Sequence, residues 1–332
     1  FGLYAAEGKS IDFVGESVTP NAQDIDGIFN AGTLNINGNG TDIYTGSVNL
    51  NTLAGNGTTN IYGGTVSTKG IITQDVLNIY GGTLNAEIYD LRIASSLNNK
   101  GTLETYGNLN DLSTIENTGT LKIQTGETLA VSNSKDLGGT LDLNNSTLDM
   151  QETGTSPVVY SILNVDTLKG TGDLKINLTL KDGFENCDKI IYTAANNAIV
   201  NLTDINLQEG YTEHTLLAKD NLIVLDGIGA VLNVGENTST QIGNYLYTFT
   251  NGSTEGSLKA YEIYNKVPLV DYITSTDFGL LVDEYSFDSD DLLVSSIETG
   301  SANPSSRDSY TMKMNGYNLN GLGNDGITIT DG

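Results

Sequence analysis

A short motif recurs at nearly constant spacing along the first half of the chain. The segment Asn60–Val66, Asn-Ile-Tyr-Gly-Gly-Thr-Val, returns almost unchanged at Asn78–Leu84. Its core is a glycine followed by Thr or Ser and then Leu or Val, and it starts at Gly32, Gly46, Gly64, Gly82, Gly101, Gly119 and Gly139. A nearly fixed period of this kind is typical of repeat architectures, in which each unit packs on its neighbours.

Each repeat has the pattern of short strands joined by turns. In the segment Thr120–Ile123, the apolar residues Leu121 and Ile123 alternate with Thr120 and Lys122, as on a strand with one buried face. Such a unit is shorter than a propeller blade or a strand–helix–strand unit. The period therefore predicts an all-β fold, a right-handed parallel β-helix (solenoid) with about 18–20 residues per coil. The right hand is expected because nearly all parallel crossover connections have it.

An antiparallel sandwich or barrel is the alternative that the sequence leaves open. Dipeptides favoured in two-residue hairpin turns occur at Asn39-Gly40, Asn56-Gly57 and Asn251-Gly252. Strands in such a fold recur roughly every 8–12 residues. The motif of this chain recurs at longer and, from Gly46 on, nearly constant intervals, which favours the β-helix.

Equivalent side chains in successive repeats predict ladders along the stack. Recurrent Thr and Asn can hydrogen-bond from one coil to the next. Tyr62 and Tyr80 hold equivalent positions in the two copies of the longer motif, so their rings are expected to stack. Exposed tyrosine faces can also bind sugars or protein partners, and this second role stays open.

The regularity of the repeat divides the chain into four segments. We expect an N-terminal strand or cap over residues 1–27, regular β-helix repeats over 28–180, irregular coils over 181–235, and a β-rich cap or subdomain over 236–332. Tyrosines and acidic residues gather in the last segment. Because an open end coil is an exposed edge that invites association, a stack of coils needs a cover at its ends.

The acidic composition limits the partners that the chain can bind. It has 41 Asp and Glu against 15 Lys and Arg, for a formal net charge of -26. This charge repels nucleic acids and anionic membrane surfaces, so neither is an expected partner. No apolar run reaches the roughly 18 residues that a membrane-spanning helix needs, and no membrane insertion is expected for this segment. The first residue, Phe1, suggests a processed or excised piece.

Residue types that support catalysis are scarce. The single histidine, His214, has no nucleophile motif around it, and the single cysteine, Cys187, stands next to Asp188, whose charge would raise the thiol pKa. These counts exclude a zinc site built from several His and Cys ligands. No local pattern separates a catalytic pair of carboxylates from solvated ones. We therefore expect a protein that is not an enzyme, with no catalytic and no cofactor-binding residue.

Calcium is the one metal that the sequence suggests. Asp288, Asp290 and Asp291 offer oxygen ligands within a short polar stretch, and Ca²⁺ binds through such ligands. Their spacing matches neither the EF-hand loop nor the glycine-rich calcium repeat, so ordinary polar turns are the competing interpretation. The three aspartates are the candidate calcium ligands, and no other cofactor is expected.

The Gly-Gly-Thr-Leu and Asn-Ile-Tyr-Gly-Gly-Thr repeats resemble those in the passenger regions of bacterial autotransporters and related adhesin-like surface proteins. The resemblance covers residues 28–180 well and the remainder loosely. It implies export, display at the bacterial cell surface, and a role in adhesion, self-association or surface structure.

Repeat and resemblance together predict a secreted, non-catalytic extracellular protein, an adhesin or structural scaffold that presents a β-helix rod. Its expected partners are a host or bacterial surface glycan or protein, or a second copy of the chain. Two alternatives stay open, namely a self-assembling subunit of a surface layer or filament, and a polysaccharide-active β-helix enzyme that uses paired carboxylates.

Overall fold

The computed structural model describes residues 2–13, 27–70, 72–86, 91–109, 115–151, 160–181, 184–207, 219–235, 238–242 and 245–264, and six short strands further along the chain. The chain divides into two units. Unit 1 comprises Phe1–Thr212, Lys219–Thr238 and Thr250–Lys259, and unit 2 comprises Glu213–Ala218, Ser239–Phe249 and Ala260–Gly332. The described residues form strands and turns without any α-helix, which confirms the all-β class.

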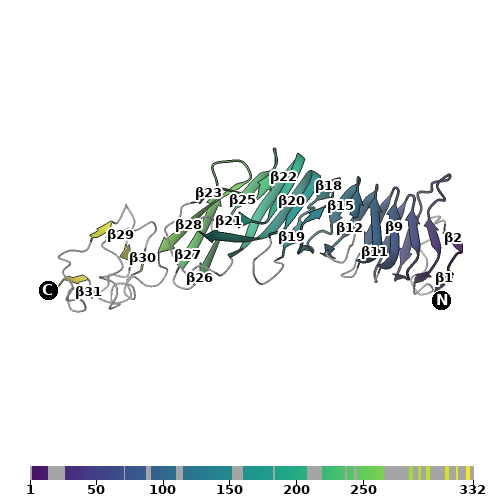
Figure 1. The fold of residues 1–332 in the computed structure, drawn as a ribbon, viewed down its shortest axis with the longest axis horizontal. Helices are drawn as coiled ribbons and strands as arrows, with labels where there is room; N and C mark the ends of the chain where they lie inside the picture. Colours follow the sequence, from purple (N-terminus) through teal and green to yellow (C-terminus); the bar gives the residue numbers. More distant parts are fainter. Residues whose placement is uncertain are drawn as a thin grey trace. The chain divides into compact units, whose positions relative to one another are not determined.

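Two sheets of parallel strands build unit 1, and Figure 1 shows their strands stacked one behind the next in chain order. The nine-stranded sheet consists of β1 (Leu3–Ala5), β2 (Ser10–Phe13), β3 (Ile28–Asn30), β4 (Thr33–Ile36), β6 (Leu53–Ala54), β7 (Thr58–Ile61), β9 (Ile72–Ile79), β11 (Leu91–Asn99) and β14 (Ile115–Asn117). The fifteen-stranded sheet consists of β5 (Ser47–Leu50), β8 (Thr65–Thr68), β10 (Thr83–Ala86), β12 (Thr102–Thr105), β13 (Gly107–Asn108), β15 (Thr120–Ile123), β16 (Thr128–Val131), β17 (Lys135–Asp136), β18 (Thr140–Asp142), β19 (Ser146–Met150), β20 (Ile162–Lys181), β21 (Phe184–Cys187), β22 (Lys189–Leu207), β24 (Leu225–Asp226) and β25 (Val231–Val234). Only β21 runs antiparallel to its neighbour within these described strands, so the antiparallel alternative is wrong for unit 1.

The sequence motif sets the register of the fifteen-stranded sheet. Its second residue forms one line across six strands, at Ser47, Thr65, Thr83, Thr102, Thr120 and Thr140, and Thr167 of β20 continues this line without a preceding glycine. The residue after each of these points inward, and Leu84, Leu103 and Leu141 are fully buried. Each buried leucine contributes roughly 1.5–3 kcal/mol, because its side chain leaves water. The stack therefore shares one continuous apolar core.

One occurrence of the motif is not equivalent to the others. Counting Gly32-Thr33-Leu34 as the first repeat is wrong, because Thr33 lies in the nine-stranded sheet, opposite Ser10 and Thr58. The short interval from Gly32 to Gly46 thus joins two different sheets. Both sheets need the same alternation of inward apolar and outward polar residues, so the motif alone does not identify the sheet.

Asparagine side chains form a ladder on the outer face of the nine-stranded sheet. Asn98 Nδ2 donates to Asn78 Oδ1 at 2.6 Å, Asn78 to Asn60 at 2.7 Å, and Asn60 to Asn35 at 2.8 Å. Asn35 in turn donates to the Asp12 carboxylate at 2.7 Å. All donors point the same way, and the series ends on the charged carboxylate of Asp12. The expected asparagine ladder is confirmed.

Charged side chains alternate in sign along the fifteen-stranded sheet. Glu104, Lys122, Asp142 and Lys169 occupy one line of the register. Lys122 Nζ lies 3.2 Å from the Glu104 carboxylate, and Lys169 Nζ lies 3.0 Å from that of Asp142. Partly exposed pairs such as these contribute about 0–1 kcal/mol each. The charged side chains of these regular strands are thus already paired with each other.

Longer repeats follow in the second part of unit 1. Strands β20 and β22 span 20 and 19 residues and pair in parallel over most of their length. The register between them shifts twice, between Lys169 and Thr171 and between Leu174 and Lys175. At each shift β22 contains one residue more than the paired part of β20. These extra residues explain why the motif fades from the sequence, although parallel pairing continues to β25.

Unit 2 contains shorter strand pairs. Strand β26 (Ser239–Ile242) pairs antiparallel with β27 (Tyr245–Asn251). Three parallel pairs follow: β29 (Glu284–Ser286) with β32 (Thr311–Lys313), β30 (Asp291–Leu292) with β33 (Leu319–Asn320), and β31 (Ile297–Thr299) with β34 (Ile327–Ile329). Two strands remain: β23 (Lys219–Ile223) belongs to unit 1, and β28 (Ser257–Tyr264) begins in unit 1 and ends in unit 2.

Candidate functional site

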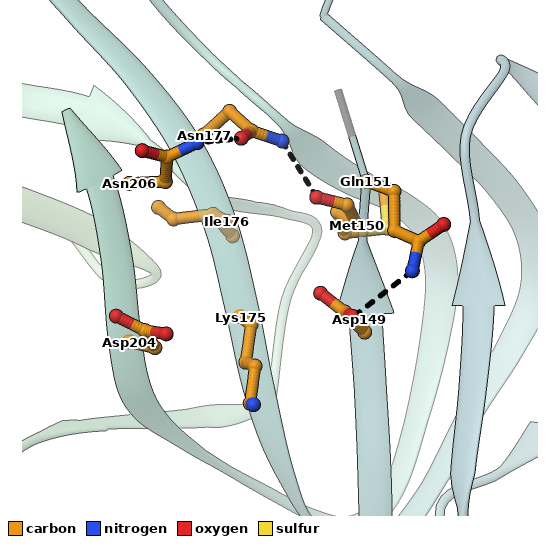
Figure 2. A pocket seen from close by; sticks show the side chains of 8 residues that line it. All are labelled: Asp149, Met150, Gln151, Lys175, Ile176, Asn177, Asp204 and Asn206. Carbon is orange, nitrogen blue, oxygen red and sulfur yellow. Dashed lines mark hydrogen bonds between the residues drawn. The ribbon is translucent and has the colours of Figure 1, made fainter. Parts of the chain in front are cut away.

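A groove of about 220 Å³ opens on unit 1 where β19, β20 and β22 lie next to one another. Figure 2 shows side chains from the three strands in two rows, one charged and one of carboxamides. The buried residues Met150 and Ile176 lie between the rows. The complete lining is Asp149, Met150, Gln151, Lys175, Ile176, Asn177, Asp204 and Asn206.

The charged row follows from the register of the three strands. Asp149 lies opposite Lys175, and Lys175 lies opposite Asp204. Figure 2 shows the lysine between the two carboxylates. Thr203 has no opposite residue in β20, because Leu174 pairs with Leu202 and the next residue already pairs with Asp204. Such a bulge bends a strand and re-aims the following side chain. It brings Asp204 into the row.

Two groups in this row are free to bind a ligand. Within the described part of the chain, neither the Lys175 ammonium nor the Asp204 carboxylate has a hydrogen-bond or ion-pair partner. The Asp149 carboxylate accepts one hydrogen bond, from Gln151 Nε2 at 3.3 Å. The groove thus combines an unpaired cation with an unpaired anion, unlike the paired charges elsewhere on the same sheet.

The carboxamide row is held in place by hydrogen bonds. Asn206 Nδ2 donates to Asn177 Oδ1 at 2.9 Å, and Asn177 Nδ2 donates to the Met150 carbonyl at 2.6 Å. Figure 2 shows both amides on the same side of the groove. Fixed amides offer donors and acceptors at set positions, which lowers the entropy lost when a polar ligand binds.

A buried carboxylate anchors this row. Asp188 is fully buried, and its Oδ2 accepts hydrogen bonds from the Asn177 backbone N–H and Nδ2, both at 2.7 Å. Its Oδ1 accepts the Ser161 N–H at 2.6 Å. Burial raises the pKa of Asp188 to about 6, against the lowering effect of these hydrogen bonds, and the Asp149 charge adds a further increase. The position of Asn177 therefore depends on a carboxyl group that titrates near neutral pH.

A second depression, of about 300 Å³, lies at another irregularity of unit 1. It adjoins the place where the register between β9 and β11 shifts, between Ile93 and Ser96. Its lining is Gly55, Asn56, Thr73, Gln74, Asp75, Arg92, Ile93 and Ala94. Here the Asp75 carboxylate accepts a hydrogen bond from Ser95, and Gln74 is buried against Asn30 and Thr59. Because these groups are already partnered, the first groove is the stronger candidate site.

The residues singled out from the sequence lie elsewhere. Asp288, Asp290 and His214 fall outside the described residues, and of Asp291 only the backbone in β30 is described. Among the residues that the structure describes, no group of three or more His, Cys, Asp or Glu side chains could hold a metal ion. Cys187 is buried, and its pKa is raised to about 12, mainly by burial and only in a minor part by Asp188.

Sequence reasoning missed the groove because its residues come from distant positions. Asp149, Lys175 and Asp204 follow the aligned leucines Leu148, Leu174 and Leu202. Aligning the chain on these leucines would have brought Asp149 next to Lys175. The extra residue before Asp204 breaks that alignment, so its place in the row follows only from the structure.

No protein-family model, curated protein or solved structure matches this chain. In the described part of the chain, no helix has the length and apolar character needed to cross a membrane. The groove and the strands that build it are therefore the features of the molecule that bear on function.

Proposed function

We propose that the chain is a secreted, non-catalytic surface protein, an adhesin or scaffold, that binds a hydroxyl-rich ligand such as a surface glycan in the groove between β19, β20 and β22. One observation carries the proposal: among the described residues, the groove holds an ammonium and a carboxylate that have no partner, beside fixed carboxamides. Sugar hydroxyls both donate and accept hydrogen bonds, so they can satisfy all of these groups at once.

Other ligand classes suit the groove less well. Lys175 lies between the two carboxylates, so a metal ion there would meet a positive charge. Polyanions are opposed by the formal net charge of -26. A neutral or weakly charged glycan avoids both penalties.

For the fold we propose a right-handed parallel β-helix with about 18–20 residues per regular coil. Its support is the unbroken in-register parallel pairing along the repeat and the strong right-handed preference of parallel connections. Such a stack is stiff, because each strand bonds to both neighbours. A stiff scaffold exported to the cell surface would hold the groove away from the surface, as the resemblance to adhesin-like passengers suggests.

Glycan binding can be tested on an array of neutral and acidic bacterial and host glycans, with affinities then measured by calorimetry. The wild-type chain should bind at least one neutral glycan. Asp204→Asn and Lys175→Met should each weaken that binding by about tenfold to a hundredfold, since each removes a charged hydrogen-bond partner worth about 1.5–3 kcal/mol. Asp136→Asn, which changes an exposed carboxylate on β17, is the matched control and should bind like the wild type. Full binding by both groove variants would refute the assignment of the site.

A polysaccharide-active enzyme is the alternative that the same groove allows. Asp149 and Asp204 lie on strands two spacings apart, or about 9.6 Å between backbones, which is close to the roughly 6.5–9.5 Å that separates the carboxyl groups of inverting glycosidases. The intervening Lys175 argues against it, because the space for a water or a glycosidic oxygen is taken by the lysine. Release of reducing sugar that is lost in Asp149→Asn and Asp204→Asn would replace the binding proposal with this one.

Self-assembly is favoured by a different observation. In the described residues, the edge strands β1 and β2 each have a single partner strand, and Tyr4 and Phe29 stay 62% and 48% exposed although their rings stack at 5.6 Å. Light scattering after size exclusion, over a concentration series with and without calcium, tests this alternative. Mass that grows with concentration would support it, and growth only with calcium would implicate Asp288, Asp290 and Asp291. A constant monomer mass would leave the adhesin.

A further inference from the structure

A second surface of unit 1 has a different chemistry from the groove. Ile43, Tyr44 and Tyr80 are 66%, 41% and 45% exposed. The ring of Tyr62 is half-buried and stacks on Tyr80, with centroids 5.0 Å apart and an interplanar angle of 18°. We call these four residues the aromatic patch. The tyrosine stacking expected from the repeat is confirmed, but it leaves apolar surface exposed that a ladder alone does not require.

The patch includes a loop that interrupts the repeat. Residues 37–46 connect β4 of the nine-stranded sheet to β5 of the fifteen-stranded sheet. Asn37 is buried, and its Nδ2 donates to the carbonyls of Gly46 at 2.8 Å and Gly63 at 3.0 Å. The Tyr44 N–H donates to the Asn37 carbonyl at 3.0 Å. The loop that carries Ile43 and Tyr44 is therefore fixed against the following repeat.

Close packing on glycine brings the loop onto the tyrosines. A Cβ atom at Gly63 would lie 2.6 Å from the Tyr44 carbonyl oxygen and 2.8 Å from Ile43 Cγ2. Only glycine permits this approach, so the glycine after Tyr62 serves the patch as well as the turn. A Cβ at Gly40 would be 3.7 Å from the Tyr62 ring, which places the loop beside that ring. The patch is thus preorganised before any ligand arrives.

The geometry leaves one aromatic face open. Tyr62 is enclosed by Tyr80 and the loop. In the next repeat Asn99 pairs with Ile79. Lys100 follows Asn99 as Tyr80 follows Ile79, so Lys100 holds the position that corresponds to Tyr80. Among the described residues, no cation and no third ring packs on Tyr80, which is 45% exposed. This flat, half-exposed ring is a platform on which one planar apolar face can rest.

Charge around the platform restricts what can rest there. Asp42 lies on the loop and Asp12 on β2, and both are exposed. Burial raises the pKa of Tyr62, and the neighbouring Tyr80 and the Asp12 charge raise it further. Two carboxylates therefore lie on the Tyr62 side of the patch, where they oppose sulfated, sialylated or phosphorylated ligands, while Lys100 lies in the repeat that follows Tyr80. A cationic ligand would prefer several aromatic faces around it, whereas the parallel rings here expose a single face.

We infer that the aromatic patch is a second ligand site, which binds the apolar face of a pyranose ring in a neutral glycan by stacking on Tyr80. The C–H groups of such a ring lie against the aromatic face, while its hydroxyls stay at the rim near Asp42 and Tyr44. This site is distinct from the groove, since it is formed by the 37–46 loop and the turns that follow β7 and β9, and it shares no residue with the groove.

The experiment is calorimetric and NMR titration of the full chain with cellohexaose and chitohexaose, and with a heparin hexasaccharide as the anionic comparison. Binding of a neutral hexasaccharide should shift tyrosine ring signals. Tyr80→Leu keeps apolar bulk but removes the flat face, and it should weaken this binding by about tenfold. Tyr80→Phe keeps the face and should stay within about twofold of the wild type. Tyr4→Leu, at the other exposed aromatic stack, is the matched control.

Each outcome decides the inference. It is overturned if neither neutral hexasaccharide binds, if heparin binds better, or if Tyr80→Leu binds like the wild type. It is also overturned if Tyr80→Leu lowers the mass of an oligomer, since the patch would then be an interface between copies. The variant Asp204→Asn separates this inference from the groove proposal. Loss of hexasaccharide binding in Asp204→Asn but not in Tyr80→Leu would support the groove alone, and the reverse would support the patch alone.

Discussion

Replacing Asp188 with asparagine should change how the stability of unit 1 depends on pH. Asp188 is fully buried and accepts three N–H hydrogen bonds, from Ser161 and from the backbone and side chain of Asn177. Burial outweighs these bonds and raises its pKa from 3.8 to about 6. A carboxyl group whose pKa is higher in the folded state destabilises the fold as it ionises, so stability should fall as the pH rises from about 4 to about 6.

The size of the effect follows from the two pKa values. Between about pH 5 and about pH 7.5, a shift from 3.8 to about 6 lowers the free energy of unfolding by about 1.4 kcal/mol. An asparagine side chain does not ionise, so the Asp188→Asn variant should lack this component. Other carboxyl groups titrate in both proteins, and their contribution cancels in the difference between wild type and variant. As the pH rises from about 5 to about 7.5, the free energy of unfolding of the variant should therefore increase by about 1.4 kcal/mol relative to that of the wild type.

Urea unfolding followed by far-ultraviolet circular dichroism measures this difference at the two pH values. Both lie above the sequence pI of about 4.1, where a vanishing net charge would promote precipitation. A difference that stays constant with pH would show that the folded-state pKa of Asp188 is ordinary or lowered, because both states would then be ionised throughout this range. The three hydrogen bonds would in that case match or outweigh burial, which contradicts the raised pKa.

Three further substitutions or treatments test the core, the turns and the thiol. Leu103→Ala should lower the free energy of unfolding by about 2–5 kcal/mol, because Leu103 is fully buried. Ile228→Ala, at an exposed position, should change it by less than about 0.5 kcal/mol. Equal urea midpoints of the two variants would contradict the shared core. Gly64→Ala should lower the free energy of unfolding by more than about 1 kcal/mol, because Gly64 has φ +68° and a Cβ atom there would clash with the Gly46 carbonyl oxygen. An unchanged urea midpoint would exclude this turn. Cys187 is buried and its pKa is raised to about 12, so it should resist a thiol reagent at about pH 8 until urea unfolds the protein. Rapid labelling of the folded protein would show instead that the thiol is accessible.

The sequence predicts the parallel stack well where the repeat is regular. The line from Ser47 to Thr140 follows directly from aligned glycines, because each turn restarts a strand at the same register. The repeat does not predict the sheet in which Thr33 lies, since two sheets share one alternating pattern. It also loses the stack at β20, where Thr140 pairs with Thr167 after a longer step and no glycine motif marks the start of the strand.

The groove could not be predicted for a related reason. Asp149, Lys175 and Asp204 become neighbours only through pairings between positions far apart in the sequence, with Thr203 as a bulged residue in between. Nothing local distinguishes these side chains from the many other acids and lysines of the chain. Asp188 is equally unmarked in the sequence, because its burial depends on packing between β19, β20 and the segment before β22.

Irregularity in the repeat has a common consequence at all three surfaces. In the regular repeats, outward polar groups bond to their equivalents one strand away, as the asparagine ladder and the Glu104–Lys122 pair show, and little binding capacity is left. The groove adjoins the register shift at Lys175, the second depression adjoins the shift at Ile93, and the aromatic patch includes the 37–46 loop. Extra residues break the one-to-one pairing, so they leave side chains without an equivalent partner while the neighbouring strands stay rigid. A repeat of this kind is therefore expected to acquire ligand sites by insertion rather than by changes to the repeated residues, and Thr203 and the 37–46 loop are the insertions at which to look first.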